Sequence, residues 1–363
     1  MDQLRGFAIF LMILVNFPGS WNAIYSPFTH AMEGIQIADL VFPIFLWTVG
    51  YSIQLSLQKR ITQSNIDLLT HATLRFLLLI FCGLVLSFFP NGNWEDFRIP
   101  GVLQRIGFCY IILMILFRFF DFKSAMVVSV TLPITLALLN RFLVYGETGP
   151  ILSIDPPAIE FTLGARLDQF FFGKHIWKES KVYDPEGILT SFCSLLTVVL
   201  GLFSSHLESK YKKRYVGLFI GLFYLILGFL LSFVFPVSKT NWSLSYIFIT
   251  ASFVQFMYLF FCMSASEGGP NYLKNIFCLL FGEIGKHALF IFFMTGILAR
   301  TKFFGVLRTY IFQNLTILTQ NKWLASFLFS LIVYLGILVI TFLIKRTLMQ
   351  TRSFRFSSTK RNS

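Results

Sequence analysis

Long apolar runs alternate with short polar segments along almost the whole chain. A helix that crosses a bilayer needs roughly 20 apolar residues. The first run is short, and the ninth is interrupted by the polar segment Gly282–His287, which favours either a broken span or a loop between a surface segment and a span. The pattern predicts about ten spanning helices, at residues 4–17, 38–57, 71–89, 101–119, 123–144, 187–206, 213–236, 243–263, 274–300 and 323–346.

The composition agrees with this pattern. Only 13% of the residues are charged and 56% are hydrophobic, whereas soluble domains carry about 25% charged residues. We therefore predict an all-α fold, a polytopic membrane helix bundle, with residues 1–363 forming a single transmembrane domain. None of the five cysteines has a metal-ligand spacing, so no metal site is expected.

Lysine and arginine positions predict the orientation in the membrane, because cytoplasmic loops carry most of these residues. With Met1 in the cytoplasm, the cluster from Lys210 to Arg214 and the basic tail after Lys345 also lie inside, while residues 7–57 contain no Lys or Arg. An even number of spans puts both termini in the cytoplasm. The net charge of +13 is therefore mostly a topology signal, and nucleic acid is not an expected partner. One outside loop breaks the pattern, with Arg300, Lys302, Arg308 and Lys322.

The segment 145–186 is predicted to be a long loop outside the cytoplasm. Loops of this length without regular structure are uncommon in compact domains and often functional. On the predicted topology this loop lies on the same side as His30 and Asp39, so it is placed to cap a site there.

Ionisable groups at membrane depth are costly and therefore mark sites or paired structural contacts. His30 can act as an acid, a base or a nucleophile near neutral pH. Asp39 is nine residues further on, so it can orient the His30 imidazole only if the loop that contains Glu33 folds back. Arg105 lies at similar depth and needs a partner, for which Asp39 is the nearest candidate.

Two further arginines are expected at the cytoplasmic ends of the first and third spans. Arg5 and Arg75 could receive the phosphates of a cytosolic ligand, because guanidinium groups match phosphate geometry. The alternative is that both reach to lipid head groups. No nucleotide-binding or zinc-protease motif occurs.

Six segments in order resemble the transmembrane heparan-alpha-glucosaminide N-acetyltransferase family and its bacterial relatives. They are "DQLRGFAIFLMILVNFPGSW", "HAMEGIQIADLVFPIFLWTVGYSI", "RIPGVLQRIGFCY", "ARLDQFFFGKHIW", "YDPEGILTSFCSLLTVVLG" and "FPVSKTNWSLSYI". Each segment alone is weakly specific, whereas the ordered set, which extends over most of the chain, is specific. The domain is thereby identified as an acyltransferase domain.

The resemblance implies a reaction and its residues. Family members move acetyl from cytosolic acetyl-CoA to a glucosamine amine on the other side of the membrane. His30 matches the family's active-site histidine, Asn16 matches the asparagine of the first motif, and Asp39 is the expected catalytic partner. With the predicted topology, Arg5 and Arg75, together with Arg105, are the expected ligands of the cofactor. The acceptor is an amino sugar or glycan, and in a bacterial source the location would be the cytoplasmic (inner) membrane.

This chain departs from the family pattern at its histidine. The segment "HAMEG" is one residue shorter than the family's and lacks a tryptophan, which puts the identity of the acceptor sugar in question. Two mechanisms stay open: His30 deprotonates the amine in a ternary complex, or His30 is acetylated first and then deacylated by the sugar. Two other functions also stay open, a transporter or flippase of a glycan or glycolipid and a non-catalytic homologue. The oligomeric state also stays open, with a homodimer as one alternative.

Overall fold

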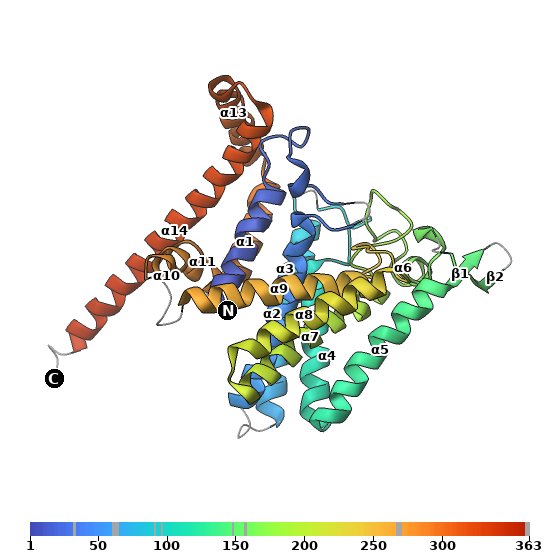
Figure 1. The fold of residues 1–363 in the computed structure, drawn as a ribbon. Coiled ribbons are helices and arrows are strands. Elements are labelled where there is room, and N and C mark those ends of the chain that lie inside the picture. Colours follow the sequence, from blue (N-terminus) through green and yellow to red (C-terminus); the bar gives the residue numbers. More distant parts are fainter. Residues whose placement is uncertain are drawn as a thin grey trace. The chain divides into compact units, whose positions relative to one another are not determined.

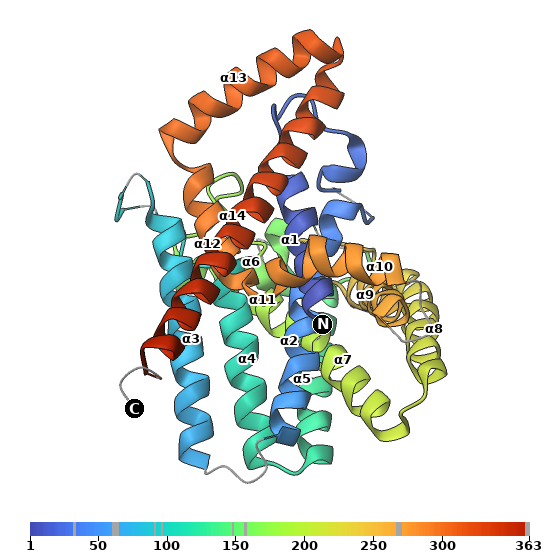
Figure 2. The same cartoon turned by 90° about the vertical axis from the view of Figure 1, so that its left-hand side faces the viewer.

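The computed structural model describes residues 1–31, 34–59, 65–90, 92–95, 97–146, 149–155, 158–265 and 271–359 (Figures 1 and 2). Among these residues, eight helices are long and apolar enough to cross a membrane, or nine if one bent pair counts as a single span. The all-α polytopic membrane bundle is therefore confirmed. The count is slightly below the expected ten, mainly because the first predicted span forms a helix of only fifteen residues, α1 (Asp2–Asn16).

The eight spanning helices follow the predicted apolar runs closely. They are α2 (Ile37–Lys59), α3 (Asn65–Phe88), α4 (Val102–Phe119), α5 (Phe122–Phe142), α7 (Ile188–Tyr211), α8 (Arg214–Ser232), α9 (Leu244–Ala265) and α14 (Lys322–Thr359).

The expected interruption of the ninth run is present. The run consists of α10 (Asn271–Phe277), a π-helical turn η3 (Cys278–Gly282), α11 (Glu283–Lys286) and α12 (Ala288–Ala299). The chain bends by 77° between Lys286 and Ala288. The segment that follows was expected to be a short loop, but it forms the helix α13 (Lys302–Thr319).

The long segment 145–186 contains regular structure in its described part. The strands β1 (Leu143–Gly146) and β2 (Gly149–Leu152) pair antiparallel. The turn η2 (Ile159–Phe161) leads into α6 (Leu163–Phe172). The side chain of Thr162 caps α6 by accepting the N–H of Ala165. A smaller turn, η1 (Ser26–Phe28), precedes the His30 segment.

The chain forms two compact units. The first unit contains residues 1–29 and 261–363, and the second contains residues 30–260. In the first unit α1 packs on η3, α11 and α14. That both units together make one acyltransferase domain stays a prediction.

The second unit is built around α7, which is buried along most of its length. Its neighbours are α2, α4, α5, α6 and α8; Figure 2 shows α4 between α3 and α5. Two glycines bring α2 and α7 into direct backbone contact. A Cβ added at Gly50 would lie 1.7 Å from the carbonyl oxygen of Val198, and one at Gly201 would lie 2.1 Å from that of Trp47. Small residues allow this close approach of membrane helices.

Candidate active site

The imidazole of His30 lies against the carboxylate of Asp39. The His30 Nδ1 atom is 2.9 Å from Asp39 Oδ1. The side chain of Asp39 is completely buried, whereas that of His30 is 53% exposed. His30 and Asp39 are therefore in contact, as the orienting role of Asp39 requires. Since Nδ1 faces Asp39, the second ring nitrogen, Nε2, is left for another partner. Met32 and Glu33 lie outside the described residues.

Backbone groups hold the Asp39 carboxylate in place. Its Oδ2 atom accepts the N–H groups of Ala31 and Gln36, each at 3.1 Å. Asp39 also lies in the first turn of α2, where the helix dipole favours a negative charge. The hydroxyl of Tyr246 donates to the backbone oxygen of Asp39 at 2.6 Å. These contacts fix the position of the carboxylate.

Lys239 completes this group, although the sequence did not single it out. Its Nζ atom is 3.2 Å from Asp39 Oδ1 and 3.1 Å from His30 Nδ1. A buried carboxylate requires a partner of opposite charge or good hydrogen bonds. Lys239 precedes α9 and is 200 residues from Asp39 in the chain. The available signal was its position inside the family-like segment "FPVSKTNWSLSYI".

Arg105 does not pair with Asp39, so that expectation is wrong. Its buried guanidinium donates to the backbone oxygen of Pro185, to Thr190 Oγ1 at 2.6 Å and to Ser191 Oγ at 3.2 Å. The reason is that Arg105, at the start of α4, faces the start of α7, where these oxygens are available, while Lys239 neutralises Asp39. The guanidinium also lies 4.8 Å from the ring of Trp242.

One nitrogen of Arg105 is left over. Among the described residues, Nη1 of Arg105 is buried and has no hydrogen-bond partner. A buried guanidinium nitrogen without a partner is costly. It is therefore a candidate contact for a bound ligand, and the assignment of Arg105 to cofactor binding stays a prediction.

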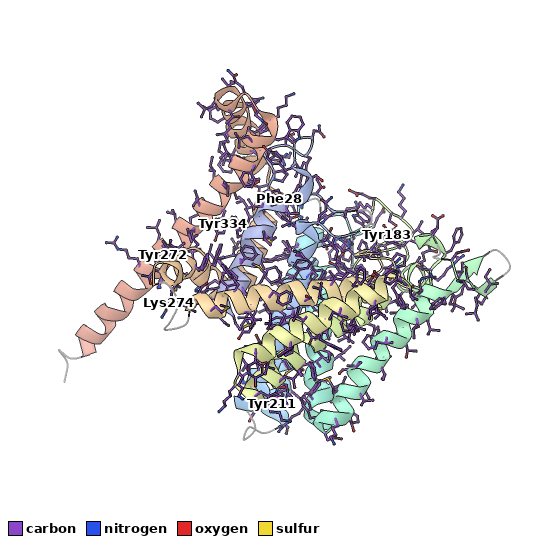
Figure 3. All side chains as sticks on the ribbon, in the orientation of Figure 1. Phe28, Tyr183, Tyr211, Tyr272, Lys274 and Tyr334 are labelled. Carbon is purple, nitrogen blue, oxygen red and sulfur yellow. The ribbon has the colours of Figure 1, made fainter. Side chains whose placement is uncertain are left out.

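A second charged group joins the α3–α4 connection to the segment before α7. Arg98 donates through Nε to Asp184 at 2.8 Å and through Nη2 to both Asp184 and Glu186. Tyr183 marks this segment in Figure 3. Burial alone would raise the pKa of Glu186, but the positive charges of Arg98, Arg105 and Lys239 outweigh it and lower that pKa. Arg105, which donates to Pro185 of this segment, also lies 5.5 Å from the ring of Phe42, three residues after Asp39, so this group lies near the start of α2.

Asp168 of α6 anchors the same segment. Its carboxylate accepts the N–H groups of Asp184 at 3.0 Å and of Ile188 at 2.9 Å. Burial nevertheless raises the pKa of Asp168 to about 6. The chain from α6 to α7 is thus held by buried polar contacts beside the His30 site.

A third polar group lies at the other end of the same helices. The hydroxyl of Tyr51 donates to Glu208 at 2.9 Å and lies 2.7 Å from the hydroxyl of Tyr258, while Gln255 donates to Glu208 at 2.7 Å. Tyr51 is twelve residues after Asp39 on α2, which places it about 18 Å further along the helix. We call the two ends of the second unit the His30 end and the Glu208 end.

Several buried polar atoms at the Glu208 end lack partners in the described part of the chain. They are Trp47 Nε1, Ser205 Oγ, Ser252 Oγ and Gln255 Oε1. They come from α2, α7 and α9, the helices that also join Tyr51, Glu208 and Tyr258. Buried polar groups are normally hydrogen-bonded, so these four atoms are candidate contacts for polar groups of a ligand.

The remaining expected site residues are Arg5, Asn16 and Arg75. Arg5 and Asn16 belong to α1 of the first unit, where Arg5 Nη1 is 3.3 Å from Asp2 and Asn16 ends the helix with an exposed side chain. Arg75 was expected at the end of a span. Instead it lies ten residues, about 15 Å, inside α3 and is exposed, because α3 begins at Asn65 rather than near His71. The phosphate-binding roles of Arg5 and Arg75 stay predictions.

Comparison with known proteins identifies the family to which the chain is similar. A family model described as "Heparan-alpha-glucosaminide N-acetyltransferase, catalytic" matches residues 1–151. The human protein named heparan-alpha-glucosaminide N-acetyltransferase is 30% identical over 320 residues, covering 71% of this chain and 47% of that protein. The mouse protein of the same name is 28% identical over 318 residues, covering 71% of this chain and 48% of its own. The chain thus spans about half the length of these curated relatives.

Proposed function

Because the chain belongs to the heparan-alpha-glucosaminide N-acetyltransferase family, we propose that it is a membrane-embedded acetyltransferase that transfers acetyl from acetyl-CoA to an amino sugar of the glucosamine type. The observation that carries this proposal is the contact between His30 and the buried carboxylate of Asp39. A histidine oriented by a carboxylate is the arrangement used for base and nucleophilic catalysis.

Asp39 orients the imidazole of His30 for the reaction. When Nδ1 carries the ring proton it donates to Asp39, and the lone pair of Nε2 is then free to react. In the two-step form, Nε2 attacks the thioester carbonyl, the C–S bond breaks, and the proton lost by the imidazole goes to the sulfur to give free CoA. The sugar amine then attacks the acetyl-imidazole, the amide forms, and the amine proton returns to the imidazole. In the one-step form, His30 takes the amine proton directly.

Lys239 supports either form through Asp39 and the Nδ1 side of the His30 ring, not through the reacting Nε2. Its ammonium group neutralises Asp39 at 3.2 Å, which lets the carboxylate remain ionised while fully buried. We assign Lys239 as a positioning residue and His30 as the reacting group. Asn16, which matches the family's first motif, keeps a proposed catalytic role from the first unit.

The donor is proposed to enter at the Glu208 end. The pantetheine arm of acetyl-CoA carries amide groups along an apolar chain, and the buried atoms of Trp47, Ser205, Ser252 and Gln255 offer donors and acceptors for them. The arm would then run along α2 towards His30. Arg5, Arg75 and Arg105 remain the proposed contacts for phosphate or carbonyl oxygens.

The acceptor is proposed to reach His30 from the side opposite to the donor. The side chain of His30 is 53% exposed, and the loop 145–186 is expected on the same side of the membrane. The relatives' name specifies a glucosamine unit of heparan. In a bacterial source, an amino sugar of the cell envelope is the corresponding acceptor. Separation of donor and acceptor favours the two-step form, because only the acetyl group then has to cross.

Product analysis with purified protein tests this function. The full chain is incubated with acetyl-CoA and glucosamine, and N-acetylglucosamine and free CoA are measured by mass spectrometry; N-acetylglucosamine offered as acceptor is the blocked-amine control. The proposal expects one CoA released per amide formed and no turnover with the blocked sugar. CoA binding without transfer to any amino sugar would refute the acceptor class. Absence of CoA binding, with glycan uptake into vesicles, would favour the transporter.

A further inference from the structure

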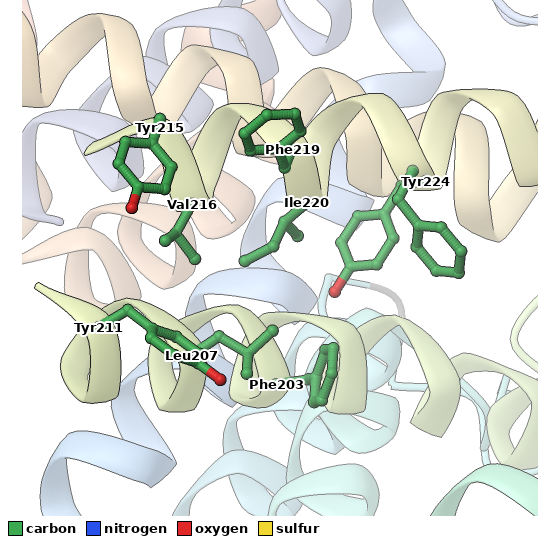
Figure 4. Close-up of a pocket in the computed structure, with 9 residues that line it drawn as sticks. Phe203, Leu207, Tyr211, Tyr215, Val216, Phe219, Ile220 and Tyr224 are labelled. Carbon is green, nitrogen blue, oxygen red and sulfur yellow. The ribbon is translucent and has the colours of Figure 1, made fainter. Parts of the chain in front are cut away.

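An open apolar groove lies between α7 and α8. Its volume is about 480 Å³, within the range of roughly 300–1,000 Å³ that is usual for small-molecule sites. Figure 4 shows the side chains of the two helices facing one another across it. The walls are formed mainly by Phe203, Leu207 and Tyr211 of α7 and by Tyr215, Phe219 and Phe223 of α8.

The groove opens to the outside of the second unit at membrane depth. Phe219 is 65% exposed and Phe223 is 57% exposed, although both helices are apolar enough to span a bilayer. The floor is closed, because Ile220 and Tyr224 are buried and the Tyr224 hydroxyl donates to the backbone oxygen of Leu200 at 3.0 Å. An apolar chain of the surrounding lipid can therefore enter from the side.

Cations stand at one end of this groove. Lys210 Nζ lies 5.4 Å from the ring centre of Tyr211, and Lys213 Nζ lies 5.5 Å from that of Tyr215. Both tyrosines line the groove, so the two ammonium groups are held at its rim. Lys212 lies between them at the turn and is exposed. None of the three lysines forms an ion pair within the described part of the chain.

We propose that the α7–α8 groove is a binding site for an anionic glycerophospholipid. One acyl chain fills the groove along Phe203, Phe219 and Phe223, and the phosphate group is bound by Lys210, Lys212 and Lys213. Lysines at a membrane surface attract acidic lipids, and tyrosines favour the interface between head groups and acyl chains.

The groove and its rim distinguish this site from a simple topology signal. Positive charge alone would orient the helices wherever it lay in the loop. Here two of the three cations lie over the same aromatic rings that line the apolar groove between α7 and α8. The charge and the apolar volume therefore match the two ends of one amphipathic ligand.

Native mass spectrometry of the full chain in detergent tests the site. Phosphatidylglycerol and phosphatidylcholine with identical acyl chains are added in equal amounts, and the bound lipid is counted. The wild type is expected to retain phosphatidylglycerol selectively. The triple variant Lys210→Gln, Lys212→Gln, Lys213→Gln should bind it about 10- to 100-fold more weakly, since each surface lysine contributes modestly. Val216→Trp, which fills the groove, should weaken it with the lysines intact.

Matched variants make the result specific. The triple variant Lys123→Gln, Lys302→Gln, Lys322→Gln removes the same charge elsewhere, and Leu222→Trp adds the same side chain to an exposed part of α8; both should bind like the wild type. Equal retention of the two lipids, or unchanged binding in the first triple variant or in Val216→Trp, would overturn the site. The site would also be overturned if the Lys210, Lys212, Lys213 triple variant lost affinity for CoA but kept the lipid. A change of oligomeric state in Val216→Trp would overturn it as well.

Discussion

At the residue scale, His30, Asp39 and Lys239 form one connected group. Burying ionisable side chains at membrane depth is costly. In this group the cost is offset, because the ammonium group of Lys239 and the imidazole of His30 lie 3.2 Å and 2.9 Å from the same oxygen of Asp39. Backbone N–H groups occupy the other oxygen. The carboxylate can thus accept a hydrogen bond from Nδ1 of His30 when that nitrogen carries the ring proton.

Asp39→Asn should therefore impair chemistry more than donor binding. An asparagine amide has the same shape, but it cannot stabilise a proton on Nδ1 as an ionised carboxylate does. We expect kcat to fall by about 10²–10⁴-fold, the range of acid–base contributions, with little change in KM for acetyl-CoA. Steady-state kinetics measures both values. Asp121→Asn, at the exposed cap of α5, is the control and should keep its activity. Full activity in Asp39→Asn would contradict the pairing.

The contribution of Glu186 to the stability of the folded protein depends on pH. The net effect of burial and of the positive charge of Arg98 lowers the pKa of Glu186 below its ordinary value of 4.5. A lowered pKa in the folded state means that the stabilisation is complete above pH 4.5 and disappears as the pH falls through the folded-state pKa. The difference in melting temperature between wild type and Glu186→Gln should be constant near neutral pH and shrink below about pH 4.5.

Glu179→Gln is the matched control for this measurement. Glu179 lies in the same segment but is exposed, so its replacement should leave the melting curve unchanged at every pH. A Glu186→Gln difference that grows on acidification would reverse the predicted sign and exclude the ion pair with Arg98 as its cause.

The sequence could indicate His30 and Asp39 because both stand in one short stretch before an apolar run. Lys239 could not be found in this way, because its contact depends on where α9 begins, 200 residues later. The same limit explains the error over Arg105. Depth along a span suggested Asp39 as its partner, but the rotation of α4 turns Arg105 towards Thr190 and Ser191 instead.

At the element scale, the close packing of α2 and α7 fixes the polar group at the His30 end relative to the polar group at the Glu208 end. Both helices begin near the His30 site, and Gly50 and Gly201 remove the side chains that would keep the backbones apart. Because α2 carries Asp39 near one end and Tyr51 near the other, a shift between the helices would disturb both polar groups.

Gly201→Ala should destabilise the protein although alanine normally favours helices. The added Cβ would lie 2.1 Å from the carbonyl oxygen of Trp47, so the helices must separate, at a cost of about 1–3 kcal/mol. Thermal unfolding in detergent should show a lower melting temperature. Gly336→Ala in α14 meets nothing within 4 Å and should be neutral or slightly stabilising. Equal behaviour of the two variants would rule out the tight α2–α7 contact.

Apolar length predicted most spanning helices correctly, because it measures the property that a bilayer selects. Apolar length was less informative for the segments that do not span the membrane. The segment after Ala299 is too polar to be read as a span, yet it forms α13, and the strands β1 and β2 have no strong alternating pattern. The break at His287 was visible because Gly282–His287 interrupts an apolar run.

At the scale of the whole molecule, the predicted topology places donor and acceptor on opposite sides. Both termini and the Lys210–Arg214 cluster are expected in the cytoplasm, with the loop 145–186 outside. In a bacterial host, a fluorescent protein fused after Ser363 should fold and fluoresce, and alkaline phosphatase inserted after Glu179 should be active. The reverse pair of results would invert the membrane orientation and, with it, the proposed side of acetyl-CoA entry.

The most direct measurement is acetyl transfer from radiolabelled acetyl-CoA to glucosamine by the purified wild type beside His30→Ala. Both proteins are first shown to elute identically in detergent, so that loss of folding is excluded. The predicted result is labelled N-acetylglucosamine with the wild type and none with His30→Ala, while both still bind CoA. Undiminished transfer by His30→Ala would contradict the assignment of His30 as the group through which the acetyl transfer proceeds.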